Sequence, residues 1–401
     1  MIADSGPSES QREVRRRELF AAFFRIGLTS FGMAILQNLK AETLRRRFLT
    51  VREFQEGLAL VQLYPGPIMV DLVAFIGYRN RGITGALAAT IGFLLPATGL
   101  MVLLSAAYLR YGDLHAVGVM TTGLNALVVG IVLKVTLDFA ARNLKGRWDM
   151  ALAFCAFAFA LARIDSLWAV LGGLLLGAFL WRKTAEPVVS HTAALNWSRL
   201  VPPAIIGAGL VAVGLWAASH ASPLYDLTAA FMKIGAVAFG NGATILPVMR
   251  QTVIDVHHWV TPAQFATAVG FGQITPGPML NSATFIGYQV AGSGGALVAT
   301  FAIFAPSIAM TLVFTELFAH VRHLAPIQGA IRGVMAVFVG LLAGITLDLG
   351  EHALINPMAF VFAAGALVTL RWLRWDITVV LAGGLAAWAI VSYITPFGGT
   401  S

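Results

Sequence analysis

Gln62-Leu63-Tyr64-Pro65-Gly66-Pro67 is the stretch that decides the fold, because it recurs as Gln273-Ile274-Thr275-Pro276-Gly277-Pro278. The two stretches lie about 210 residues apart, each inside an apolar run. Proline removes a backbone donor and glycine adopts conformations closed to other residues, so a regular helix cannot continue through either stretch. The sequence therefore predicts two interrupted helices at equivalent places.

Further matches in the same order surround both turns. They pair Phe31-Gly32 with Phe239-Gly240, Phe75-Ile76-Gly77-Tyr78 with Phe285-Ile286-Gly287-Tyr288, and Val135-Thr136-Leu137-Asp138 with Ile345-Thr346-Leu347-Asp348. So many ordered matches indicate that the chain is two copies of one unit, and such repeats are typical of secondary transporters.

The predicted boundaries follow from the repeat and from composition. We expect a disordered cytoplasmic tail at residues 1–15, an N-terminal transporter repeat at 16–182, a cytoplasmic linker at 183–200 and a C-terminal repeat at 201–401.

Composition indicates a membrane protein. Of 401 residues, 58% are hydrophobic and 11% are charged, whereas soluble domains carry about 25% charged residues. This excludes a soluble enzyme, and the net charge of +8 needs no nucleic acid because cytoplasmic loops collect Lys and Arg. There is no phosphate-binding loop, no convincing metal-ligand set and one cysteine, Cys155. We predict an all-α polytopic membrane protein that is not an enzyme and uses no cofactor.

Loop charges predict the orientation. Basic residues flank the first copy at Arg12, Arg15, Arg16, Arg17, Lys40, Arg45, Arg46, Arg47, Arg52, Arg79 and Arg81, whereas the corresponding flanks of the second copy carry Arg250 alone. Because basic flanks stay in the cytoplasm, the two copies are expected to have inverted topology. We place the N-terminus in the cytoplasm and the C-terminus outside the plasma membrane.

The same rule predicts re-entrant segments. Segments 19–38 and 54–78 each have basic loops at both ends, so each is expected to enter the membrane, break and return. Segments 228–248 and 263–288 would repeat this from the outside, with breaks at Ser30-Phe31-Gly32 and Gly240-Asn241-Gly242 in the segments that lack Pro-Gly-Pro. Kinked crossings remain the alternative.

The broken helices are the predicted anion site. Interrupted backbone at membrane depth exposes N–H groups and the positive end of the helix dipole. The expected substrate-binding residues come from both turns and from two equivalent cations: Arg25, Lys233, Gln62, Pro65, Gly66, Pro67, Gln273, Thr275, Pro276, Gly277, Pro278 and Asn281.

Several ionisable residues in apolar segments have open alternatives. Arg25 and Lys233 would bracket a dianion, or Arg25 extends to the interface and Lys233 pairs with a carboxylate. Asp71 is a candidate proton carrier, or a partner of Arg79. Glu316 would relay protons or pair with Arg332. Separately, Lys134 is expected to pair with Asp138 one helical turn away.

With these motifs the chain resembles the chromate ion transporter (CHR) family in its long, two-domain form. The resemblance rests on Phe239-Gly240-Asn241-Gly242, both Pro-Gly-Pro turns, Gly77-Tyr78-Arg79, Gly287-Tyr288, Pro96 and Pro306. The chain departs from the family pattern at Met33-Ala34, Tyr64 and Asp71. The resemblance implies export of chromate across the plasma membrane, with sulfate as a related oxyanion.

We therefore predict a secondary active transporter that exports an inorganic oxyanion by alternating access, with a proton as a candidate coupling ion. An anion channel, or a carrier for a different small anion, is the alternative. The lipid bilayer is the expected environment, and the sequence leaves homodimer formation open.

Overall fold

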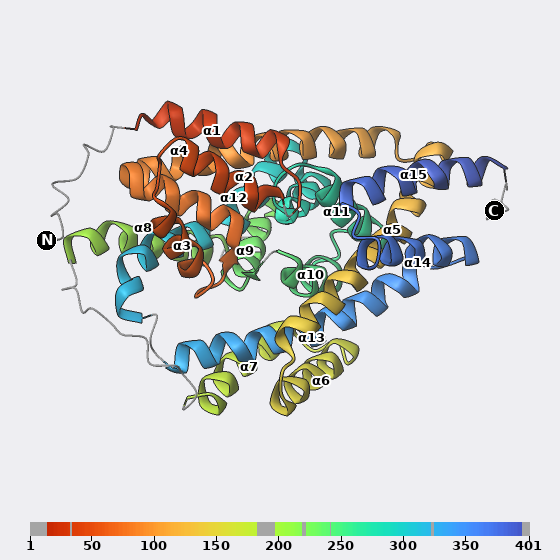
Figure 1. The fold of residues 1–401 in the computed structure, drawn as a ribbon. Coiled ribbons are helices and arrows are strands. Elements are labelled where there is room, and N and C mark those ends of the chain that lie inside the picture. The colour runs from red at the N-terminus through yellow and green to blue at the C-terminus, as the bar shows by residue number, and fades with distance from the viewer. Residues whose placement is uncertain are drawn as a thin grey trace, which may run out of the picture.

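The computed structural model describes residues 14–32, 34–182, 197–218, 222–240, 242–321 and 325–394. These residues are almost entirely helical, which confirms the predicted all-α class (Figure 1). Most of the predicted tail (1–15) and linker (183–200) lies outside the described residues.

The main helices recur in the same order in the two copies, whereas the two short strands lie at different places in them. The first copy contains α1 (Arg16–Thr29), α2 (Ala34–Arg45), α3 (Val51–Leu60), β1 (Gly66–Pro67), α4 (Ile68–Tyr111), α5 (His115–Asn143), α6 (Arg147–Leu161) and α7 (Ser166–Leu180). After α8 (Trp197–Ala218), the second contains α9 (Pro223–Ala236), β2 (Phe239–Gly240), the 3-10 turn η1 (Ala243–Ile245), α10 (Leu246–Arg250), the π-helix η2 (Gln251–Val256), α11 (Pro262–Ile274), the 3-10 turn η3 (Met279–Asn281), α12 (Ser282–Val321), α13 (Ala325–Ala353), α14 (Pro357–Arg371) and α15 (Ile377–Ile394).

The chain leaves the helical path at each predicted break. α1 ends just before Ser30, and α9 ends shortly before β2. α3 and α11 both end just ahead of their Pro-Gly-Pro turns. Since proline and glycine act on the local backbone, these four interruptions could be predicted from the residues alone.

Matching caps start the helices that lead into the turns. Thr50 accepts a hydrogen bond from the backbone N–H of Glu53, whose carboxylate accepts from the Thr50 N–H in return. Thr261 and Gln264 form the same capping box at the start of α11. These reciprocal bonds satisfy N–H groups that a helix end would otherwise leave unpaired.

α3 and the first part of α4 form a hairpin with the Pro-Gly-Pro turn at its tip. Arg79 bonds to Glu53 at 3.1 Å, and the Phe75 ring lies against Gly57, one turn deeper. From the first pair to the second, the residue number rises on α3 and falls on α4. The two helices are therefore antiparallel. A hairpin of this kind is compatible with the predicted re-entrant segment, which stays a prediction.

α4 then folds back at Gly82, and α12 does the same at Gly292. Gly82 has φ +59° and ψ −150°, and Gly292 has φ +57° and ψ −148°. These conformations are essentially restricted to glycine. Beyond each bend the helix packs against itself, with Gly77 touching Gly85 and Gly287 touching Gly295.

The second part of each long helix packs against the first helix of its own copy. Gly27 of α1 lies directly against the Phe93 carbonyl of α4, and Gly235 of α9 lies against the Ile303 carbonyl of α12. The missing side chains let the backbones approach closely, as in many membrane helix pairs.

The two copies meet at α5 and α13, which contact each other through equivalent residues. The Thr136 and Thr346 hydroxyls are 3.1 Å apart. On one side of this pair Arg332 of α13 bonds at 2.8 Å to Asp149, which lies at the start of α6 directly after α5, and on the other side Gly350 of α13 lies beside Val129 of α5. Along this contact, residue numbers fall in the first copy while they rise in the second. The helices α5 and α13 are therefore antiparallel. This arrangement is consistent with inverted repeats.

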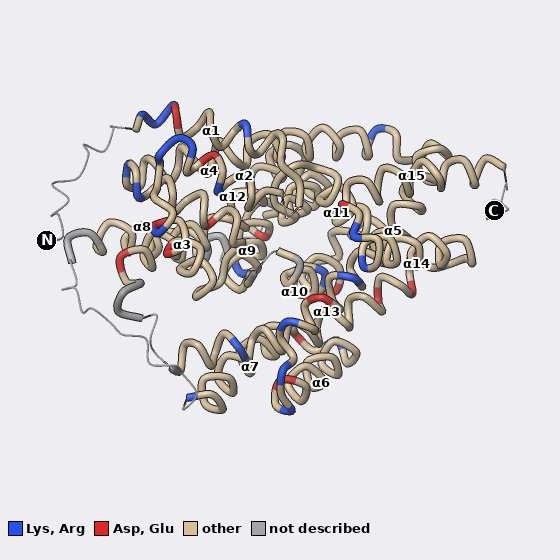
Figure 2. Tube along the Cα trace, in the orientation of Figure 1, with Lys and Arg blue, Asp and Glu red and all other residues tan. Residues whose placement is uncertain are grey.

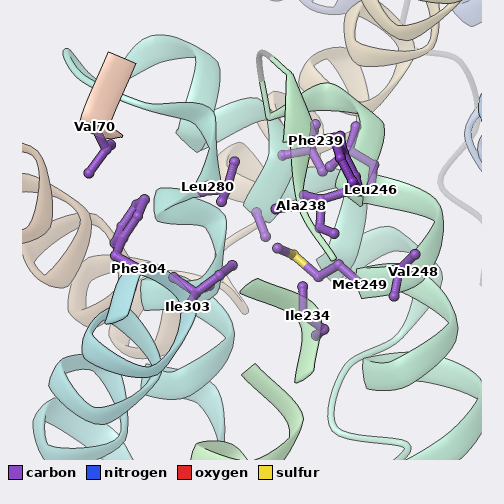
Figure 3. Close-up of a cluster of buried hydrophobic side chains, with 14 of the residues drawn as sticks. Val70, Ile234, Ala238, Phe239, Leu246, Val248, Met249, Leu280, Ile303 and Phe304 are labelled. Carbon is purple, nitrogen blue, oxygen red and sulfur yellow. The ribbon is translucent and has the colours of Figure 1, made fainter. Parts of the chain in front are cut away.

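The copies are also interlocked. α13 packs against α6 and α7 of the first copy, and α5 packs against α14 and α15 of the second (Figure 1). Buried side chains gather where the broken segment of the second copy passes between helices (Figure 3). Phe239, Leu280 and Ile303 there are at most 3% exposed, so this apolar packing holds the interrupted backbone in place.

The outer surface suits lipid. Five described helices are long and apolar enough to cross a membrane: α4, α5, α15, 279–317 and 326–353. Leu103, Phe154 and Leu175 are each at least 68% exposed. Long stretches carry no charge, while Lys and Arg gather around the start of α1 and the α2–α3 loop (Figure 2). The protein is membrane-embedded.

Candidate functional site

Each Pro-Gly-Pro turn lies against the broken helix of the other copy. β1, in the first turn, pairs in parallel with β2, with Gly66 opposite Phe239. Reciprocally, the Gly277 N–H of the second turn donates to the Ser30 carbonyl at 3.2 Å. The predicted turns are therefore brought to one region in which both copies contribute backbone.

The first turn is covered by a buried acid. Asp71 is fully buried on the first turn of α4, where its carboxyl group faces the hydroxyls of Ser307 and Thr311. A Cβ at Gly66 would overlap Asp71 Oδ2 and would lie 3.0 Å from Ser307 Cβ. Only glycine leaves room for the carboxyl group at this place. The Tyr64 hydroxyl donates to Thr311 Oγ1 at 2.8 Å, so α12 of the second copy closes this turn.

The second turn carries neutral polar groups. Thr275 and Asn281 are 2% and 0% exposed, and the Thr275 hydroxyl and the whole Asn281 amide find no hydrogen-bond partner among the residues that the structure describes. Gly277 has φ +103°, and a Cβ there would lie 2.8 Å from Ala97. Buried polar groups usually have hydrogen-bond partners. Their unmet capacity at this turn indicates a place where a polar ligand or water binds.

The two predicted glutamines do not behave alike. Gln273 donates to the Met279 thioether at 2.6 Å and is partly buried. Gln62 is exposed. Thioether sulfur is a weak acceptor, so Gln273 gives up little if it turns toward an anion.

The two predicted cations lie in different surroundings. Arg25 is exposed and lines a pocket of about 290 Å³ with Ser30, Asn38, Glu42 and Arg45. Since the Ser30 carbonyl contacts Gly277, this pocket adjoins the second turn.

Lys233 is about half exposed and lies 3.7 Å from Asp165. It is not among the residues that line the Arg25 pocket. The structure therefore places Arg25 next to one turn and leaves Lys233 beside a carboxylate, as the alternative interpretation of Lys233 expected.

The alternative partners expected for the two intramembrane acids are occupied elsewhere. Arg79 pairs with Glu53 and not with Asp71. Arg332 pairs with Asp149 and not with Glu316, which instead accepts a hydrogen bond from the Tyr78 hydroxyl at 3.0 Å. The predicted Lys134–Asp138 pair is confirmed at 2.9 Å, and Arg371 joins it at 2.8 Å.

One ionic cluster was missed from the sequence. Arg250 is 8% exposed and makes a two-pronged bond to Asp348, with both distances 2.7 Å, and a further bond to Asp255. The cluster borders a cavity whose lining includes Arg163 and Gln251. The only signal in the sequence was that Arg250 is the single basic residue on the flanks of the second copy.

The site can therefore present two kinds of chemistry. Backbone N–H groups, a hydroxyl and an amide at the second turn suit an anion. A buried carboxyl group at the first turn can gain or lose a proton.

Comparison with known proteins gives a consistent result. A family model described as "Chromate transporter" matches residues 17–178 and 225–388. A "Chromate transport protein" of Cupriavidus metallidurans is 28% identical over 389 residues, covering 94% of both chains. A "Chromate transport protein" of Pseudomonas aeruginosa is 29% identical over 398 residues, covering 93% of this chain and 92% of the relative.

A shorter relative matches only part of the chain. "Uncharacterized transporter YwrB" of Bacillus subtilis is 29% identical over 136 residues, which is 33% of this chain and 68% of that protein. No solved structure matches.

Proposed function

Because the chain belongs to the chromate transporter family, a family of transport proteins and not of enzymes, we propose that it is a secondary active transporter that exports chromate. Sulfate, another tetrahedral oxyanion, is the related substrate. The observation that carries the proposal is that each Pro-Gly-Pro turn makes backbone hydrogen bonds to the broken helix of the other copy.

These reciprocal contacts between the copies suit alternating access. Each turn belongs to one copy and its backbone partner to the other, so movement of one copy against the other changes both turns together. We propose that the copies have inverted topology and rock about the α5–α13 contact, which would open the turns to one side of the plasma membrane and then to the other.

The anion would bind at the turns. Thr275 and Asn281 have unmet hydrogen-bonding capacity there, and interrupted helices leave backbone N–H groups free for an anion. Arg25 would draw the substrate into the pocket that adjoins the second turn, on the cytoplasmic side of the proposed orientation. Lys233 would serve the equivalent position outside, where the substrate would compete with Asp165 for its charge.

The test is flux in proteoliposomes with chromate, sulfate or phosphate as the only permeant oxyanion. We expect unlabelled chromate or sulfate inside to drive counterflow of labelled sulfate, and Asn281→Leu to abolish it. Gln55→Leu, an exposed amide on α3, is the matched control and should retain it. Flux without counterflow would identify an anion channel, and counterflow confined to phosphate would identify a carrier for a different anion. Either result would overturn the proposal.

A further inference from the structure

Asp71 and Glu316 lie at opposite ends of one polar seam between α4 and α12. At the deep end Asp71 lies beside Ser307 over the first turn, and at the shallow end Tyr78 bonds to Glu316. Asp71 and Tyr78 are seven residues apart on α4 and therefore share one helix face. From the first contact to the second, the residue number rises on both α4 and α12. The same face of each helix therefore forms the seam along its whole length.

Hydroxyl groups line the seam between the acids. Ser307, Thr311 and Thr315 recur at four-residue intervals on α12, and each hydroxyl donates to a backbone carbonyl of its own helix. The Tyr64 hydroxyl in turn donates to Thr311 Oγ1. Asp71, Ser307 and Thr311 are fully buried, whereas Thr315, Glu316 and Tyr78 are partly exposed. Exposure thus increases steadily toward the end that carries Arg79 and the basic loops.

The equivalent seam in the other half keeps some hydroxyls but lacks both acids. At the positions of Tyr64, Tyr78 and Thr315 it carries Thr275, Tyr288 and Ser105, whereas at the positions of Asp71, Ser307, Thr311 and Glu316 it carries Asn281, Ala97, Met101 and Ala106. The two carboxyl groups are therefore confined to one side of the repeat, which points to a task that the two halves do not share.

From this geometry we infer that the α4–α12 seam is a proton pathway, with Asp71 as the deep proton-binding site and Glu316 as the group that exchanges protons with the cytoplasmic side. The inference rests on the proposed function and assigns its coupling ion. In the coupled step the Asp71 carboxylate takes up one proton and becomes a neutral carboxylic acid, with no other bond made or broken.

Electrostatics gives the sign of the coupling. An ionised carboxylate with no counter-charge is costly to bury, and a nearby anion adds like-charge repulsion. The proton therefore binds more readily when the oxyanion is present, so the two move in the same direction. A dianion that moves with one proton keeps a net negative charge, so the inside-negative membrane potential is the force that drives its export.

Within the described part of the chain, no cation pairs with Asp71. Tyr64 faces it from the turn, while Ser307 and Thr311 face it from α12. Arg79 on α4 is paired with Glu53 of α3. Arg25 of α1 is exposed in its own pocket, and Glu316 lies at the far end of the seam.

The experiment uses the purified full chain and a pH-indicator dye. Adding sulfate to the wild-type protein over a series of pH values should cause proton uptake at those values where Asp71 is ionised before sulfate binds, because linked binding of this kind is reciprocal. Asp71→Asn should abolish the uptake. Asparagine already occupies the equivalent position 281, so the fold accommodates this change. Glu56→Gln, an exposed acid on α3, is the matched control and should behave as the wild type.

Proteoliposomes supply the second measurement. An acidic medium on the sulfate side should raise sulfate accumulation in the wild type, and Asp71→Asn should reduce this pH-driven accumulation about tenfold, within the usual range of coupling energies. Glu316→Gln should slow the proton uptake while leaving its final extent unchanged.

The outcomes separate this inference from the proposed function. Wild-type protein that moves sulfate without protons, or in response to a sodium gradient, overturns the proton pathway and leaves the transporter standing. Proton uptake that persists in Asp71→Asn also overturns it. Wild-type protein that neither binds nor moves any oxyanion overturns both.

Discussion

Gly66 shows how a missing side chain sets the geometry of the first turn. The Asp71 carboxyl group occupies the space that a Cβ at residue 66 would need, and Ser307 closes the other side. Gly66 is buried between them. The acid and the turn are therefore fitted to each other, and neither can change alone.

We predict that Gly66→Ala destabilises the protein by about 1–3 kcal/mol, as overpacking does in other cores, and abolishes oxyanion flux. The matched control is Gly99→Ala on α4, where an added Cβ meets no atom within 4 Å. Its thermal midpoint in detergent and its flux should equal those of the wild type. Equal behaviour of the two variants would show that Asp71 does not hold the turn.

Arg250 joins parts of the chain that lie far apart in the sequence. Its guanidinium group bonds to Asp348 of α13 and to Asp255 of η2. Its side chain is only 10% exposed, so these ion pairs are screened far less by water than surface pairs are.

We expect Arg250→Gln to lower the free energy of unfolding by about 3–5 kcal/mol, because two carboxylates would lose their buried partner. Arg52→Gln is the control: its side chain is 88% exposed and pairs with Glu56, and such pairs contribute at most about 1 kcal/mol. Chemical denaturation in detergent measures both. A loss for Arg250→Gln no larger than the control's would mean that Asp348 and Asp255 are stabilised without this arginine.

At the scale of elements, sequence located the interruptions but not their partners. Proline and glycine dictate local backbone, so the breaks near Ser30, Pro65, Gly240 and Pro276 were predictable. The Lys134–Asp138 pair was predictable because its members lie one helical turn apart.

Partners that depend on tertiary packing were not predictable. The pairing of Arg250 with Asp348 joins residues 98 positions apart. Arg79 and Arg332, the expected partners of Asp71 and Glu316, are bound by Glu53 and Asp149. Sequence showed which residues were ionisable and embedded, whereas the order in which helices pack decided which of them meet.

The bends at Gly82 and Gly292 show how the conformation of one residue shapes a whole helix. Nothing lies within 4 Å of an added Cβ at Gly292, so glycine is needed there for its backbone conformation and not for space. The bend brings Gly287 against Gly295 and turns one long helix into a hairpin.

Gly292→Ala is expected to destabilise the protein by about 1–3 kcal/mol, the usual cost of forcing a side chain into such a conformation, and to lower flux. Gly294→Ala, two residues away and equally uncrowded but without a positive φ, should leave both unchanged. Thermal unfolding in detergent and counterflow in proteoliposomes provide the readouts. If both alanine variants are silent, the bend does not depend on glycine.

At the scale of the whole molecule, the proposed mechanism depends on two copies that face opposite sides of the membrane. The antiparallel contact of α5 and α13 through Thr136 and Thr346 is consistent with that arrangement, and so is the imbalance of basic residues between the flanks. Arg52 and Ala263 occupy equivalent exposed positions near the starts of α3 and α11, which makes them suitable reporters of sidedness.

We predict that Arg52→Cys reacts with a membrane-impermeant maleimide only from the cytoplasmic side, and Ala263→Cys only from the outside. Both variants should be made in a Cys155→Ser background, because Cys155 is exposed. Right-side-out and inside-out vesicles give the two sides, and labelling in detergent confirms that each thiol is reactive. Inverted copies place equivalent residues on opposite faces, so the two patterns should be mirror images. Labelling of both thiols from one side would mean that the copies are parallel, and rocking about a shared pair of turns could then not expose an anion alternately to the two compartments.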